Sequence, residues 1–175
     1  MIQNEVIKAT IRPRKSYLGY IYYRSIEQLQ VGAPDREHLL AQIKISLAGY
    51  AAEKIVFGTV TSGVSLDFQH IFHFAHDMVW RFGMGKSGLL GDFLTLTSRR
   101  TGDPIVINSE KTKEILDNDV QDILQTCLKE TTAILTKHRD VLEYFTQELL
   151  KKGDLEYDEI EAIFKKFGLK PMYRT

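Results

Sequence analysis

The chain has 175 residues and carries 23 basic and 23 acidic side chains, so its formal net charge at pH 7 is zero. This balance gives no overall attraction for nucleic acid or for an anionic membrane surface, and we expect no nucleic-acid partner. The length is sufficient for one domain with a substantial core. Cys127 is the only cysteine, which excludes an internal disulfide and fits a location on the cytoplasmic or another reducing side.

The first part of the chain has the pattern of a small β element. Residues 6–11 alternate branched and polar side chains, and residues 17–23 are rich in aromatic and β-branched residues. Both segments are therefore predicted to be strands. Pro13 lies between them and marks the end of the first strand. We expect the two strands to pair as a hairpin or within one small sheet.

The rest of the chain is predicted to be mostly helical. Apolar residues recur at helical spacing after Asp35, after Asp67, from Ser109 and after His138, and again in residues 154–167. Asp35 has a suitable side chain for an N-cap. The fold is therefore expected to be mainly α (α+β), with a small N-terminal β-hairpin or sheet followed by a helical bundle. The apolar face of the second helix is expected to comprise Phe68, Ile71, Phe72, Ala75, Met78, Val79 and Phe82.

We expect a single domain over residues 1–168. Residues 1–97 would hold the β element and the candidate site, residues 105–168 the helical bundle, and residues 169–175 a disordered tail. No apolar run is long enough to span a membrane, although the amphipathic helices leave a membrane-peripheral protein open as an alternative. The glycines near Gly85 are not followed by the Lys-Ser/Thr pair of a phosphate loop, so no ATPase module is predicted.

The loop Thr61-Ser62-Gly63-Val64-Ser65-Leu66-Asp67 brings a carboxylate to the start of the second helix. Asp67 has two interpretations: it complements the helix start, or it is one ligand of a metal whose other ligands lie elsewhere. His70, His73 and His76 follow on the same helix. Successive steps of three residues turn side chains back by about 60°, so all four groups cannot converge on one ion. A polar helix face is the simpler interpretation, and an ion shared by two neighbours is a minor alternative.

Taken in order, several stretches resemble the C-terminal peptidase domain of FtsH-type ATP-dependent zinc metalloproteases, which belong to the AAA+ proteases. Each stretch is a weak motif alone, but their order and spacing are specific and cover nearly the whole chain. They are Thr10–Arg14, Leu18–Tyr20, Leu47–Gly58, Thr61–Asp67, Met78–Gly85, Ser109–Leu124 and Asp154–Ile163.

The resemblance implies proteolysis by a zinc-dependent hydrolase that works as a ring of six, a hexamer, on unfolded or membrane proteins. Members of the family are anchored to a membrane by a segment that is absent from this sequence. In the family, zinc is held by two histidines of a His-Glu-x-x-His helix and by a distant aspartate, and the glutamate is the general base. Asp67 matches that aspartate.

Two further parts of the chain gain an implied role from the resemblance. Glu53, in Ala-Ala-Glu, is implied as a carboxylate that supports the metal site, although an ordinary helix residue with a structural partner explains it equally well. The sheet edge on which substrate lies extended in the family corresponds to residues 18–22. These are Leu18, Gly19, Tyr20, Ile21 and Tyr22.

The sequence departs from the family pattern because it contains no His-Glu-x-x-His motif. One carboxylate cannot hold a zinc ion, so the chain alone is predicted to be inactive and to bind no zinc by itself. Leu66 also stands where the family usually has a polar residue. Two explanations are open. The chain is either a fragment of a longer protease or a natural pseudo-peptidase, a non-enzymatic scaffold for assembly or partner binding.

Overall fold

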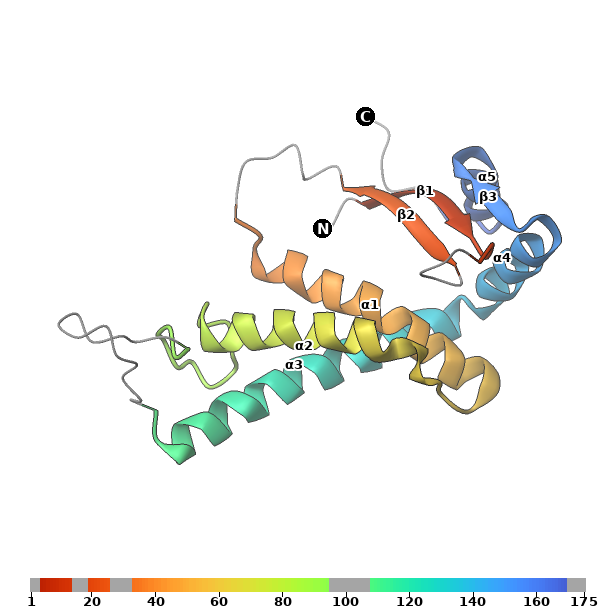
Figure 1. Cartoon of the computed structure of the whole chain (residues 1–175). Coiled ribbons are helices and arrows are strands. Elements are labelled where there is room, and N and C mark those ends of the chain that lie inside the picture. Colours follow the sequence, from red (N-terminus) through yellow and green to blue (C-terminus); the bar gives the residue numbers. More distant parts are fainter. Residues whose placement is uncertain (1–3, 14–18, 26–32, 95–107, 170–175) are drawn as a thin grey trace. The chain divides into compact units, whose positions relative to one another are not determined.

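The computed structural model describes residues 4–13, 19–25, 33–94 and 108–169, and it is mainly helical with one small sheet (Figure 1). This confirms the expected fold class. In chain order the elements are β1 (Asn4–Thr10), β2 (Tyr20–Ser25), α1 (Arg36–Phe57), the 3-10 helix η2 (Ser62–Val64), α2 (Ser65–Trp80), α3 (Glu110–Lys137), α4 (Arg139–Lys152), β3 (Asp154–Glu156) and α5 (Tyr157–Lys166).

The chain divides into two compact units. Unit 1 combines residues 1–33 with residues 137–175 and contains the three strands, α4 and α5. Unit 2 is the continuous stretch 34–136 and contains α1, η2, α2 and nearly all of α3. The predicted halves, residues 1–97 and 105–168, do not coincide with these two units. A single domain over residues 1–168 stays a prediction. The predicted tail lies outside the described residues from residue 170 onward.

The sheet of unit 1 has the strand order β2-β1-β3, with both pairings antiparallel. Ala9 of β1 is opposite Ile21 of β2 on one side and Leu155 of β3 on the other. The predicted pairing of the first two strands is therefore confirmed. The prediction of a helix from Asp154 is wrong for its first three residues, because Leu155 is fully buried in a third strand and α5 begins only at Tyr157.

The core of unit 1 joins both ends of the chain. Ala9, Leu155, Ile160 and Ile163 are buried together, and side chains of α4 pack against them. Arg12 fastens the end of β1 to the turn before β3, because it forms an ion pair with Asp154 and donates a hydrogen bond to the carbonyl of Lys152 at 3.3 Å.

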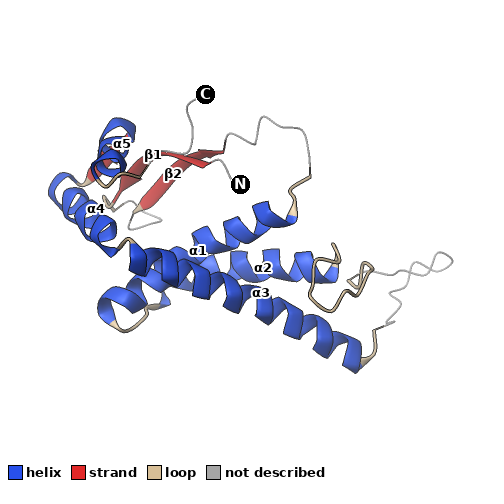
Figure 2. Cartoon of the chain, turned by 180° about the vertical axis from the view of Figure 1, so that it is seen from behind, coloured by secondary structure: helices blue, strands red, loops and turns tan. Residues whose placement is uncertain are grey.

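In unit 2, α1, α2 and α3 lie side by side, as Figures 1 and 2 both show. Asp35 caps α1 as predicted, since its Oδ1 accepts a hydrogen bond from the backbone N–H of His38 at 2.8 Å. Gly58 ends this helix with a φ of 69°, a left-handed conformation that favours glycine. The fully buried members of the core include Ile43, Ala75, Met78, Val79, Leu116, Val120 and Cys127.

The predicted apolar face of α2 is only partly buried. Ile71, Ala75, Met78 and Val79 are in the core, as expected. The other three residues of the predicted face, Phe68, Phe72 and Phe82, are 39%, 50% and 49% exposed. The apolar arc of the sequence is wider than the strip that α1 and α3 cover, and the chain leaves the helix at Trp80, before Phe82. None of the described helices is long and apolar enough to cross a membrane.

Candidate functional site

Asp67 lies in the first turn of α2 and is partly buried. The N-cap residue of this helix is Val64, and no side chain caps the helix start. Within the described residues, the Asp67 carboxylate makes no hydrogen bond and no ion pair. Its charge is favourable at this end of the helix dipole, typically by about 0.3–1 kcal/mol. The carboxylate is therefore positioned by the fold without a protein partner in the described part of the chain.

The loop before Asp67 is held in place by Glu53 of α1. Glu53 Oε2 accepts a hydrogen bond from the backbone N–H of Thr61 at 2.7 Å, and Oε1 accepts one from the Thr61 hydroxyl at 3.1 Å. Thr61 Oγ1 in turn accepts a hydrogen bond from the N–H of Gly63 at 3.3 Å. The carboxylate thus connects the last turns of α1 to the loop that delivers Asp67.

The side chains around this loop are apolar and strongly exposed. Phe57 at the end of α1 is 72% exposed, and Leu66, next to Asp67, is 66% exposed. Val60 in the loop between them is also exposed. Large exposed apolar residues are common singly, but three in one short stretch of chain mark a surface suited to an interaction.

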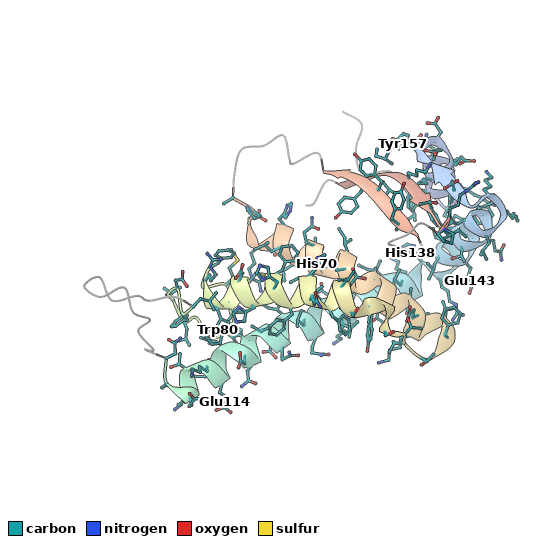
Figure 3. The ribbon with its side chains drawn as sticks, in the orientation of Figure 1. His70, Trp80, Glu114, His138, Glu143 and Tyr157 are labelled. Atoms are coloured by element: carbon teal, nitrogen blue, oxygen red, sulfur yellow. The ribbon has the colours of Figure 1, made fainter. Side chains whose placement is uncertain are left out.

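The histidines of α2 do not gather around Asp67. His70 and Trp80 both project from this helix (Figure 3). His73 Nε2 lies 3.6 Å from Asp77 Oδ2, one turn further along. The His76 ring stacks on Trp80 with the ring centroids 4.9 Å apart and the planes 10° apart. His73 and His76 are therefore engaged with other side chains of their own helix.

A zinc ion does not fit the described residues alone. No three histidine, cysteine, aspartate or glutamate side chains in the described ranges are arranged to hold a metal ion. A catalytic zinc site needs three protein ligands and an open position. Asp67 has the right donor chemistry for one of these ligands, and Glu53 is occupied by Thr61.

The second part of the sequence-predicted site is the outer strand of the sheet. Among the described strands, β2 has a neighbour on one side only, namely β1. Its side chains Ile21 and Tyr22 are 60% and 57% exposed. A Cβ on Gly19 would lie 2.5 Å from the carbonyl oxygen of Thr10, so glycine permits the close approach at the start of β2. Leu18 lies outside the described residues. Such an edge can accept another extended strand.

The structure also shows a buried carboxylate that sequence reasoning missed. Asp119 of α3 accepts hydrogen bonds from the backbone N–H of Ser87 at 2.9 Å and from its hydroxyl at 2.6 Å. A Cβ on Gly85 would lie 2.3 Å from Asp119 Oδ2, so this glycine gives the carboxylate its space. The motif ties the turn after α2 to α3 and is distant in sequence from Asp67. The signal available in the sequence was that Asp119 occupies a core-facing position of a predicted helix.

Cys127 is buried beside α1, with its Sγ 3.8 Å from the carbonyl oxygen of Leu40. Burial raises the pKa of this thiol above its ordinary value. The side chain therefore packs as a small apolar group.

Comparison with known proteins gives the family. Residues 2–163 match the pattern of Peptidase family M41, and the chain belongs to this family.

Relatives include the chloroplastic ATP-dependent zinc metalloprotease FTSH 1 of Arabidopsis thaliana, which is 31% identical over 170 residues, covering 91% of this chain and 23% of the relative. The ATP-dependent zinc metalloprotease FtsH of Borreliella burgdorferi is 32% identical over 160 residues, covering 89% and 25%. The mitochondrial inner membrane m-AAA protease component yta12 of Schizosaccharomyces pombe is 31% identical over 160 residues, covering 90% and 20%. The chain thus spans about a quarter of the length of these relatives or less.

Proposed function

We propose that the chain is the peptidase-domain region of an FtsH-type zinc metalloprotease and that Asp67 is one of the three protein ligands of its zinc ion. The observation that carries this proposal is a carboxylate without a partner in the described chain, presented by a loop that a second carboxylate fixes in place. The relatives are named as zinc metalloproteases, and the Asp67 loop lies within the matched residues.

On its own, the chain is proposed to be catalytically incomplete. Its 175 residues contain no His-Glu-x-x-His motif, and a single carboxylate does not hold a catalytic zinc ion. Two histidine ligands and the general base have to come from another segment of polypeptide. Glu53 acts in this proposal as a positioning residue, because it contacts Thr61 and not the metal.

The outer edge of β2 is proposed to hold the substrate. An extended peptide would add to the outer edge of β2 beside Ile21 and Tyr22, and main-chain hydrogen bonds would make binding tolerant of sequence. The exposed side chains of Ile21 and Tyr22 would contact alternate side chains of the peptide. By analogy with FtsH-type proteases, we also propose that the substrates are unfolded or membrane proteins. On the same basis, we propose that the protein assembles into a hexamer and is attached to a membrane.

A second candidate function is that of a pseudo-peptidase scaffold. It is favoured by the exposed apolar side chains next to Asp67, since Phe57 and Leu66 give this surface the character of a contact with another protein. In that case the loop would be kept for assembly or partner binding and would not hold metal.

The test uses the natural protein product that contains this chain, purified without chelators. For the protease, we expect about one zinc per chain by elemental mass spectrometry, and degradation of casein. Asp67→Asn should remove both with little change in folding. Asp158→Asn is the matched control, because Asp158 also lies in the first turn of a helix, α5.

Full zinc content in Asp67→Asn would reject the ligand role. A wild-type product that contains no zinc and leaves casein intact would reject the protease and leave the scaffold.

A further inference from the structure

The turn of α2 that carries Asp67 is weakly anchored by its own residues. The helix start has no side-chain cap, and none of residues 65–68 is buried. The first buried side chain of this helix is Ile71, one turn after Asp67. A helix end without a cap and without buried side chains opens easily. The Asp67 carboxylate therefore needs a contact from outside α2 to keep one orientation.

Tyr50 of α1 makes such a contact. Its ring lies against the ring of Phe68, the residue that follows Asp67, with the centroids 5.2 Å apart and an angle of 50° between the planes. Both values are within the range that aromatic pairs prefer. Phe68 is still 39% exposed. The pair is therefore a contact at the surface of unit 2 and joins α1 to the first turn of α2.

The Tyr50 ring is also in contact with its own helix. Lys54 follows one turn later on α1, and its Nζ lies 5.8 Å from the centroid of the Tyr50 ring. This distance is within the range of a cation–π interaction. Because Lys54 and Phe68 both contact the ring, Tyr50 is restrained before any other molecule binds.

One side of α1 contacts the chain both before and after Asp67. Glu53 bonds to Thr61, six residues before Asp67. Tyr50 contacts Phe68, one residue after it. Tyr50 and Glu53 are three residues apart and so lie on the same face of the helix. The Glu53 contacts fix the loop, whereas the Tyr50 contact fixes the helical turn that carries the carboxylate.

We propose that Tyr50 is a positioning residue for the candidate zinc ligand. It acts through Phe68, because the ring contact restrains the first turn of α2 and this turn sets the direction of the Asp67 carboxylate. The inference rests on the proposed function, since it gives Tyr50 a role in metal binding. An aromatic pair with a purely structural role would stabilise the fold but would not change the zinc affinity of the folded molecules.

The first test measures zinc affinity in the natural protein product that contains this chain. Tyr50→Leu removes the ring and keeps an apolar side chain that suits a helix. We expect its zinc Kd, measured by competition with a chromophoric chelator, to rise about two- to tenfold, which corresponds to the loss of one aromatic pair. Tyr50→Phe keeps the ring and should match wild type. The visible spectrum of the cobalt-substituted protein reports ligand geometry, and it should change in Tyr50→Leu but not in Tyr50→Phe.

Two further variants show whether the effect passes through the pair. Phe68→Leu should weaken zinc binding as much as Tyr50→Leu, and the double variant should be no weaker than either, because all three lack the same contact. Tyr144→Leu is the matched control. Tyr144 also lies on a helix and pairs with a phenylalanine, Phe167, with the centroids 5.6 Å apart. This pair belongs to unit 1, so its loss should leave the zinc Kd unchanged.

A measurement without metal separates this inference from the proposed function. In the 175-residue chain, native-state exchange of the amides of Phe68 and Gln69 reports opening of the first turn of α2. This exchange should be about two- to tenfold faster in Tyr50→Leu than in wild type. Tyr144→Leu should leave it unchanged.

Unchanged amide exchange in Tyr50→Leu would overturn the inference, whatever the metal content of the natural product. An unchanged zinc Kd, an equal loss in Tyr50→Phe or Tyr144→Leu, or a double variant that adds the two losses would also overturn it. A wild-type product without zinc would reject the proposed function and, with it, the metal role of Tyr50. Faster exchange of the Phe68 amide would still show in that case that Tyr50 holds the turn.

Discussion

The contact between Glu53 and the loop of Asp67 gives the sharpest prediction about the candidate site. Replacing Glu53 by alanine removes both acceptors of Thr61, the backbone N–H and the hydroxyl. The loop from Thr61 to Gly63 should then open more often, while α1 itself stays folded, because alanine is the better helix former by a few tenths of a kcal/mol.

The magnitude follows from two hydrogen bonds to one carboxylate. Hydrogen bonds to charged groups contribute about 1.5–3 kcal/mol each in mutational series. Both are solvent-exposed here, so we reduce this to about 0.5–1 kcal/mol each. The free energy of opening at Thr61 should therefore fall by about 1–2 kcal/mol, which is a five- to thirtyfold faster amide exchange. Glu53→Gln keeps one acceptor and should lose about half as much.

Native-state hydrogen exchange at Thr61 and Gly63 is the appropriate assay, since the two units need not unfold together. Glu114→Ala is the control, because Glu114 is an exposed glutamate of α3 with no partner in the described chain (Figure 3). Unchanged exchange at Thr61 in Glu53→Ala would refute the positioning role. Equal acceleration in Glu114→Ala would show that the effect is not local.

Three further predictions concern the rest of the fold. Gly85→Ala should lower the free energy of unfolding by about 2–4 kcal/mol, because its Cβ displaces the buried Asp119 carboxylate from Ser87; a urea midpoint equal to wild type would contradict the contact. The Cys127 thiol should react with Ellman's reagent at pH 8 only as fast as unit 2 opens, and immediate labelling would place the thiol at the surface. Because burial raises the pKa of this thiol in the folded state, the free energy of unfolding should decline as pH rises above the ordinary cysteine pKa. A hydrogen bond from Thr10, assisted by Arg12, lowers the pKa of Asp154, so its stabilisation is present above the unfolded value near 4 and is lost as pH falls through the lower folded pKa. Asp154→Asn should therefore weaken the loss of thermal stability that occurs as pH falls below about 4. An unchanged acid dependence would remove this carboxylate as a cause.

The helices were predictable because the periodicity of their apolar residues and the residues that start and end them are local features of the sequence. Asp35 and Gly58 bound α1 as their chemistry indicates, and His138 marks the break between α3 and α4. Strand β3 was not predictable by the same means, since three residues are too few to show alternation. Its existence depends on the pairing of Leu155 with Ala9, far away in the chain. The capping box of Glu156 and Glu159 was a local sign that the helix starts later.

The candidate site was predictable in position but not in geometry. The order of the motifs placed Asp67 at the start of a helix, where the structure has it. The contact of Glu53 with Thr61 joins two residues across a helix end, and no periodic pattern encodes it. Nor does an apolar arc reveal how much of it a neighbouring helix covers. The exposure of Phe72 could therefore be read only from the three-dimensional structure.

The composition of unit 1 from both ends of the chain has a consequence for synthesis. Residues 34–136 form a continuous unit that can complete its core while the ribosome is still translating. The hairpin of β1 and β2 is synthesised before α1, but its partners are synthesised only after α3, since Lys8 pairs with Glu156, 148 residues later. A two-stranded hairpin is only marginally stable. Until translation reaches Leu155, the nascent chain thus carries an unprotected pair of strands, and this is the stage at which a chaperone would be most needed.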